Sequence, residues 1–200
     1  MARPRTGDKR EDIVESVIAD VAERGLDGAS MAGIAARAGV AVGTIYRYFP
    51  DRDALLRDAH LDIKRRLHGR LAAAAGRHDT PQESMREAWL TLVDLASERP
   101  RDFLYITAAA GHALADAARR EEYERMNAEL RELLVRAVGG EEAIVGDGEA
   151  GRVRAQALVT LFVAPAMQLA RDAALAGRAP DAALSNQLFD MVWRGLRDVD

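Results

Sequence analysis

The stretch Ser30–Phe49 constrains the fold of this chain more than any other. Ser30 can cap the N-terminus of a short helix, and Ile34 follows on the face that such a helix would bury. Gly39 comes where the helix must end and the chain turns through positive φ. A second helix is expected to begin at about Val42. This pattern indicates a helix-turn-helix, which places its second helix in the DNA major groove; the alternative is a helical hairpin in any all-α protein.

The second of these helices divides its residues between an inner and an outer face. Ile45 and Phe49 are apolar at helical spacing and are expected to point inward. Arg47 is the best candidate for reading guanine, because arginine can donate two hydrogen bonds to that base. Thr44 and Tyr46 are expected to contact phosphates or thymine methyl groups. The residues expected at the DNA are Ser30, Val42, Gly43, Thr44, Tyr46, Arg47, Tyr48 and Arg52.

The same stretch resembles the DNA-binding domain of TetR-family transcriptional regulators. Three residues depart from the family's pattern: Ala41 replaces the usual Ser or Pro, Tyr48 the common His, and Arg52 the common Lys. Tyr48 and Arg52 both keep a side chain that can bind phosphate. The resemblance implies a dimer that releases DNA when a small molecule binds. The resemblance covers about residues 13–56. The matching residues are Ile34-Ala35, Ala38-Gly39-Val40, Gly43-Thr44-Ile45-Tyr46, Tyr48-Phe49, Arg52 and Leu55-Leu56.

The distribution of charge is compatible with DNA binding although the net charge is −4. Residues 1–50 hold as many basic as acidic side chains, and the acidic excess lies in residues 79–200. The helix-turn-helix contains Arg37 and Arg47 and no acid. DNA recognition depends on local charge, so the acidic C-terminal part does not argue against it.

Helical periodicity continues along the whole chain, and no strand pattern is convincing. We therefore predict an all-α fold with an N-terminal three-helix helix-turn-helix domain and a C-terminal helical ligand-binding and dimerisation domain. The predicted domain boundaries are residues 1–50 and 51–200. Helices are expected over about 8–24, 51–77, 80–98, from 100, from 112 to 138, 152–176 and 180–197, with a loop over 141–151.

The last two predicted helices are apolar over more of their circumference than a single packing contact needs. Burial of both helices within one chain is one explanation. We prefer cover by a second copy of the chain, in a twofold four-helix interface. Pro165 is expected to kink the first of the two helices. The residues expected at the dimer interface are Leu158, Leu161, Leu184, Leu188, Met191 and Val192.

The middle helices bring large aromatic and methionine side chains together with few polar groups, which is typical of an apolar ligand cavity. An ordinary packed core is the alternative for any one of them. An apolar or amphipathic ligand suits this set better than an anionic one, because burying an unpaired charge is costly. The expected lining residues are Met85, Trp89, Phe103, Ile106, Tyr123, Met126, Asn127 and Phe162.

The sequence offers no catalytic or cofactor motif. It has no cysteine, which excludes zinc–thiolate sites and cysteine nucleophiles. Its four histidines form no His-x₃-His pair, and neither a phosphate loop nor a Gly-x-Ser-x-Gly elbow occurs. We therefore expect no cofactor, no metal and no enzymatic activity. The sequence shows no signal peptide and no full-length membrane span, so a cytoplasmic protein without a membrane partner is expected.

Together these patterns predict a homodimeric, ligand-responsive DNA-binding regulator, most simply a repressor. Its partners would be double-stranded DNA and a small-molecule effector. One alternative is a helical small-molecule enzyme with an incidental helix-turn-helix, although no catalytic constellation is visible. The other is an architectural protein that binds DNA without sequence preference, which a steep salt dependence without a preferred site would identify.

Overall fold

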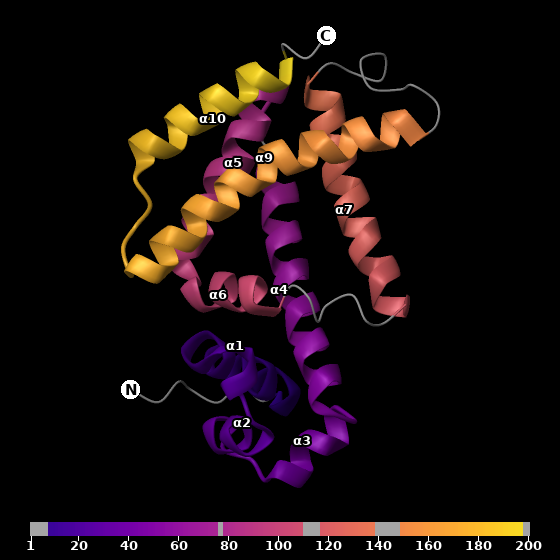
Figure 1. The fold of residues 1–200 in the computed structure, drawn as a ribbon, viewed down its shortest axis with the longest axis vertical. Helices are drawn as coiled ribbons and strands as arrows, with labels where there is room; N and C mark the ends of the chain where they lie inside the picture. Colours follow the sequence, from indigo (N-terminus) through magenta and orange to yellow (C-terminus); the bar gives the residue numbers. More distant parts are fainter. Residues whose placement is uncertain (1–7, 76–77, 110–116, 139–148, 198–200) are drawn as a thin grey trace. The chain divides into compact units, whose positions relative to one another are not determined.

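The computed structural model describes residues 8–75, 78–109, 117–138 and 149–197. All regular structure in these ranges is α-helical (Figure 1), which confirms the predicted fold class. The helices are α1 (Lys9–Gly28), α2 (Met31–Ala38), α3 (Val42–Tyr48), α4 (Arg52–Ala75), α5 (Pro81–Glu98), α6 (Pro100–Ala109), α7 (Ala117–Val138), α9 (Glu149–Ala176) and α10 (Ala182–Arg197).

Several helix ends lie where the local sequence signals predict them. The Ser30 hydroxyl accepts a hydrogen bond from the backbone N–H of Gly33 at 3.1 Å and caps α2. The Thr80 hydroxyl oxygen accepts from the N–H of Glu83 at 3.3 Å and caps α5. Gly39 ends α2 at φ 68° and ψ 34°, the left-handed conformation that glycine adopts without strain. The turn between α2 and α3 is therefore set by local chemistry.

One predicted helix end is confirmed and one predicted bound is wrong. Gly25 has the non-helical values φ 75° and ψ 171°, so the first helix is broken where it was predicted to end, and a short further helical stretch of α1 continues to Gly28. α9 begins at Glu149, so the last part of the predicted loop over 141–151 is helical. Its earlier part lies outside the described residues.

The packing divides the chain into two compact units. Unit 1 comprises residues 1–64 and 101–120, and unit 2 comprises residues 65–100 and 121–200. α4 therefore contributes residues to both units, and most of α6 belongs to the unit that contains the helix-turn-helix. The predicted boundary at residue 50 concerns the division of functions and stays a prediction.

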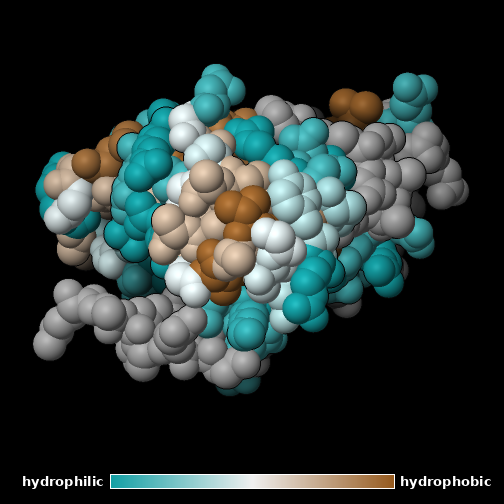
Figure 2. Space-filling view, turned by 90° about the horizontal axis from the view of Figure 1, so that it is seen from below, coloured by the Kyte–Doolittle hydropathy of each residue, from teal (hydrophilic) through white to brown (hydrophobic). Residues whose placement is uncertain are grey.

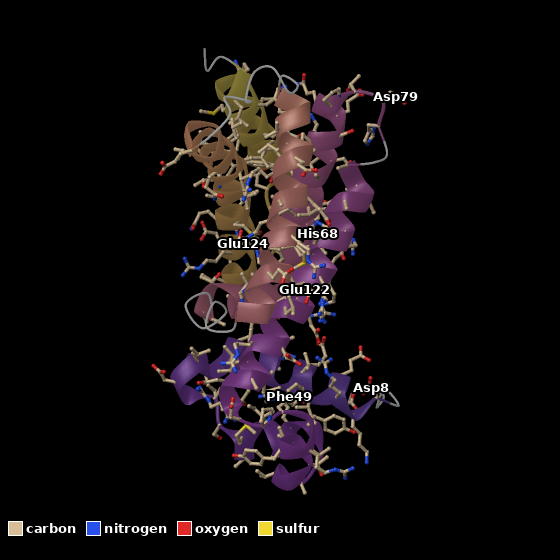
Figure 3. All side chains as sticks on the ribbon, turned by 90° about the vertical axis from the view of Figure 1, so that its right-hand side faces the viewer. Asp8, Phe49, His68, Asp79, Glu122 and Glu124 are labelled. Carbon is tan, nitrogen blue, oxygen red and sulfur yellow. The ribbon has the colours of Figure 1, made fainter. Side chains whose placement is uncertain are left out.

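Unit 1 is built around the contacts of α1 with α2 and of α2 with α3. Its core is apolar, and Ile13, Ile34 and Ile45 are completely buried. Phe49, labelled in Figure 3, closes this core at 2% exposure. α6 joins the unit through Tyr105, whose hydroxyl donates a hydrogen bond to the carbonyl oxygen of Leu56 at 2.6 Å. Burial raises the pKa of this tyrosine, which therefore remains a hydrogen-bond donor.

Unit 2 is built from α5, α9 and α10, which pack on one another (Figure 1). α9 is one continuous helix through Pro165. α7 lies along the second part of α4, where Arg65 pairs with Glu122 at 2.7 Å and His68 with Glu129 at 3.1 Å. His68 and Glu122 are labelled in Figure 3.

Candidate nucleic-acid interface and effector region

α3 is held by two buried side chains and presents the rest of its surface outward. Ile45 is completely buried and Phe49, directly after the helix, is 2% exposed. Tyr46 is 52% exposed and Tyr48 is 44% exposed, and Arg47 is also exposed. The predicted division of α3 into an inner and an outer face is confirmed, with Thr44 half-buried between them. A short helix anchored on one side can therefore offer its other side to a large partner.

Arg37 is engaged within the protein, which the sequence analysis did not anticipate. Its guanidinium donates two hydrogen bonds to the carboxylate of Glu23 on α1, one of them at 3.2 Å. These bonds hold the pKa of Glu23 below its usual value. The same carboxylate accepts a hydrogen bond from Arg101 of α6 at 3.2 Å. Arg37 thus braces α2 against α1, and Arg47 is the exposed cation on α3.

The carboxylate of Asp20 lies completely buried beside this network. Arg24 and Arg37 approach it to 3.6 Å and 3.7 Å. Gly33 of α2 makes room for the network, because a Cβ atom there would lie 3.2 Å from the Arg24 guanidinium and 3.5 Å from Asp20. The sequence did contain a signal for this buried carboxylate, because Asp20 lies directly beside the apolar stripe of the first helix.

Arg52 has an internal role in addition to the one expected for it. Its Nε donates to the carbonyl oxygen of Ala29 at 3.2 Å, and one terminal nitrogen donates to the carbonyl oxygen of Leu26. These bonds tie the start of α4 to the connection between α1 and α2. The expected phosphate contact of Arg52 stays a prediction. Ser30, also expected at DNA, uses its hydroxyl oxygen to cap α2.

The predicted ligand-binding residues are distributed over both units. Met85, Trp89 and Phe162 are buried in unit 2, whereas Phe103 and Ile106 are buried in unit 1. Met126 and Asn127 are half-buried on α7, and the side chain of Tyr123 lies outside the described part of the structure. The structure brings Trp89 and Phe162 together, with ring centroids 5.4 Å apart.

Trp89 and Phe162 belong to a larger aromatic cluster in unit 2, which also contains Phe189 and Trp193. Phe189 packs on Trp89 at 5.9 Å and stacks with Trp193 at 5.8 Å. The guanidinium of Arg86 lies 4.4 Å from the Phe189 ring centroid. Among the described residues, the buried indole N–H groups of both tryptophans have no hydrogen-bond acceptor. Phe189 and Trp193 were not predicted as members of this cluster.

The predicted dimer-interface residues differ in exposure. Leu161, Leu184 and Met191 are 55%, 44% and 56% exposed, which is unusual for large apolar side chains on packed helices. Leu188 and Val192 are half-buried on α10. Leu158 is a correction, because it is 8% exposed and packs within its own chain. The exposed Val153 and Leu175 of α9, each 61% exposed, were not predicted.

The composition of α9 reflects these two faces. Within the described residues, its segment Gln156–Ala176 is the one stretch that has the length and apolar character of a membrane span. One side of it packs on α5 and α10, and the opposite side carries the exposed leucines.

In the described ranges, no three His, Cys, Asp or Glu side chains lie together as a metal-binding group would.

Comparison with known proteins agrees with this geometry. Residues 21–59 match the family model of the bacterial regulatory proteins of the tetR family. The chain is 32% identical over 133 residues to the HTH-type transcriptional repressor KstR of Rhodococcus jostii (strain RHA1), covering 66% of this chain and 60% of KstR. Across the curated relatives that it matches, the chain spans about half of their length.

Solved structures extend the similarity over nearly the whole chain. A TetR family protein from Vibrio parahaemolyticus has a TM-score of 0.70 and 28% identity, covering 94% of this chain and 98% of that one. FadR from Bacillus subtilis in complex with stearoyl-CoA has a TM-score of 0.68 at 17% identity, covering 92% and 98%, which shows a common fold.

The fold and the exposed α3 define the class of helix-turn-helix transcriptional regulators. Within that class, residues 21–59 match the TetR-family model, and the chain is similar to TetR-family regulators over most of its length.

Proposed function

We propose that this protein is a homodimeric repressor that binds a palindromic operator and releases it when a small apolar or amphipathic molecule binds. The observation that carries the proposal is the surface of α3, whose exposed side chains include Tyr46 and Arg47 and no acid. The relative KstR is named a transcriptional repressor, which supports the sign of regulation. Residues 1–50 supply the DNA-binding function and residues 51–200 supply effector binding and dimerisation, in the cytoplasm.

In this proposal each α3 enters one major groove. Arg47 donates two hydrogen bonds to a guanine, and Tyr48 and Arg52 contact phosphates. Thr44 and Tyr46 contact phosphates or thymine methyl groups. Ser30, Val42 and Gly43 lie at the same surface, near the base edges or the backbone.

The exposed apolar faces of α9 and α10 support dimerisation. Leu184 and Met191 are separated by two helical turns on α10, so they lie on nearly the same side. Burying such a face against a second copy removes apolar surface from water and stabilises the dimer. A twofold dimer presents two α3 helices, whose half-sites are expected about 34–36 Å apart or at a multiple of one helical turn.

The aromatic cluster of unit 2 supports effector binding. Large aromatic side chains and the flexible Met85 can rearrange around an apolar ligand. The two buried indole N–H groups could donate to an acceptor on that ligand. FadR, a neighbour in fold, holds stearoyl-CoA, so this fold can accommodate a small molecule. The effector would act by its higher affinity for the dimer conformation that does not fit the operator.

Selection of bound duplexes from random DNA, followed by footprinting on the selected site, tests the proposal. We expect a pseudo-palindrome protected on both half-sites by the dimer. Arg47→Ala should reduce the preference for the selected site by about 1–3 kcal/mol per guanine contact, whereas the exposed Arg194→Ala on α10 should have no effect. Protection of a single asymmetric half-site by a monomer would contradict the proposal. Equal loss of affinity for all sequences in Arg47→Ala would assign that residue to phosphate.

A further inference from the structure

The first turn of α3 exposes apolar side chains where no internal contact requires them. Val42, its first residue, is 38% exposed. Ala41 directly before it and Ala36 of α2 are exposed as well, and Ala41 makes no side-chain cap. Figure 2 shows the end of the molecule that carries α2 and α3, where apolar residues gather in the middle and hydrophilic residues surround them.

Gly43 is a second and independent observation at the same place. A Cβ atom at Gly43 would meet nothing within 4 Å, and the residue does not have a positive φ. Neither packing nor backbone conformation within the chain therefore requires glycine, although glycine is unfavourable in a helix. Its missing side chain leaves an open gap beside Val42 on the outer surface of α3. The backbone of α3 at Gly43 is therefore open to close approach from outside.

The chemistry of Val42 limits what it can recognise in the major groove. Valine has no hydrogen-bond donor or acceptor, so it cannot distinguish bases by their polar edges. The apolar group that unmodified DNA offers in the major groove is the C5-methyl of thymine. Cytosine has a hydrogen at the same position. A valine pressed against this position would therefore favour thymine over cytosine by burial of the methyl group.

We propose that Val42 reads a thymine in each operator half-site through its C5-methyl group, and that Gly43 provides the space for this close approach. The proposal rests on the proposed DNA-binding function and specifies one base of the operator. In this proposal Val42 and Arg47 recognise their bases in different ways: Val42 through contact with a methyl group, and Arg47 through hydrogen bonds. The thymine contact depends on a methyl group, so it can be removed from the DNA without changing any base pair.

Replacement of each thymine of the selected operator by uracil tests the role of Val42. Uracil keeps the base pair and lacks the methyl group. At the thymine that Val42 contacts, we expect affinity to fall roughly fourfold per half-site and about fifteenfold when both half-sites are substituted, as the burial of one methyl group gives. Falls at other thymines would report Thr44 or Tyr46 and should persist in Val42→Ala, whereas a set of uracil effects that all persist in Val42→Ala would overturn the inference. At the contacted thymine, Val42→Ala should bind the thymine and uracil duplexes equally. Tyr48→Phe on the same helix is the matched control and should keep the full difference between them.

Two further measurements complete the test. Cytosine at that position should weaken binding, and 5-methylcytosine should recover part of the loss in the original protein but not in Val42→Ala. Gly43→Ala should bind the operator more weakly with an unchanged or higher melting temperature, because its Cβ fills the external gap and no internal space.

The outcomes separate this inference from the proposed function. If the operator is selected and every uracil substitution leaves affinity unchanged, Val42 does not read a methyl group and the inference is overturned. If Gly43→Ala binds as tightly as the original protein, the close approach is overturned. If selection yields no preferred sequence, both the inference and the proposed function fail.

Discussion

The two compact units of this chain differ in what holds their helices together. In unit 1, arginines bind acids or backbone carbonyls of neighbouring elements: Arg10 pairs with Asp58 at 2.7 Å, and Arg52 donates to Ala29 at 3.2 Å. In unit 2, Arg86 likewise joins α5 to Asn186 and Asp190 of α10, but the interior of α5, α9 and α10 also contains an aromatic cluster. Unit 2 also leaves large apolar side chains exposed on α9 and α10, whereas the large exposed apolar side chains among the described residues of unit 1 lie on α3.

This difference corresponds to two different tasks. Hydrogen bonds and ion pairs have preferred geometries, so they fix α1, α2 and the start of α4, against which α3 packs through Ile45 and Phe49. Apolar contacts are non-directional and tolerate rearrangement more easily. In the proposed function, a helix that meets base edges benefits from the first kind of contact, and a region that admits an effector and a second chain benefits from the second kind. Four predictions test this comparison.

The largest expected effect is on the aromatic cluster of unit 2. Trp89→Ala removes a completely buried indole that contacts Phe162 and Phe189, so the free energy of unfolding should fall by about 3–5 kcal/mol. Trp193→Phe is the control, because it keeps a ring stacked on Phe189 and should cost under about 1.5 kcal/mol. Urea unfolding followed by circular dichroism measures both. A loss below about 1 kcal/mol in Trp89→Ala would show that polar contacts, not the aromatic cluster, hold unit 2.

The next effect concerns the buried His60 of unit 1. Burial, followed by the charge of Lys64, lowers its pKa from 6.5 to about 4. The unfolded chain therefore binds this proton at a higher pH than the folded chain does. Stability should be fully present above about pH 7 and fall by about 3 kcal/mol as the pH decreases to 4.

Amide hydrogen exchange in α1 between pH 4 and 7, corrected for the intrinsic exchange rate, measures this dependence within unit 1. His60→Leu should remove this component of the pH dependence. The exposed His78→Leu should leave it unchanged. An identical pH dependence in His60→Leu would assign the acid sensitivity to other groups.

A charge on the exposed apolar face of α10 should weaken the dimer. Met191 is 56% exposed, so Met191→Asp should change the stability of the single chain little. In a dimer the same aspartate would be buried without a partner, which we expect to weaken dimerisation by about 2 kcal/mol, or roughly 30-fold. Sedimentation over a concentration series measures this effect, and Arg178→Asp serves as the control outside the proposed interface. If Met191→Asp dimerises as strongly as the original protein, the interface lies elsewhere. The exposed apolar face of α10 would then not serve dimerisation.

The smallest effect concerns Arg52. Arg52→Met keeps the length of the side chain and removes its hydrogen bonds to Ala29 and Leu26, so unfolding should become easier by about 1–2 kcal/mol. If Arg52 also contacts phosphate, affinity should fall equally for all DNA sequences and the salt dependence of binding should decrease. An unchanged salt dependence would show that Arg52 acts only within the protein.

The sequence alone determined the elements that depend on neighbouring residues. Ser30 caps α2, Gly39 ends α2, and Ile45 and Phe49 face inward, all as predicted, and Thr80 caps α5 at the predicted start of that helix. Caps, left-handed turns and helical periodicity act over a few residues, so a single sequence is sufficient to recognise them. The helix-turn-helix and the all-α class follow from such local signals.

The tertiary structure alone decided which partner each side chain has. It showed that Arg37 is bound by Glu23 and that Asp20 is buried. It also placed Phe103 in a different unit from Trp89, and turned Leu158 inward and Leu161 outward on the same helix. These outcomes depend on contacts between residues far apart in the chain. An apolar or charged residue on a helix has the same local pattern whether it faces its own core, a second chain or solvent, so only the packed structure separates these cases.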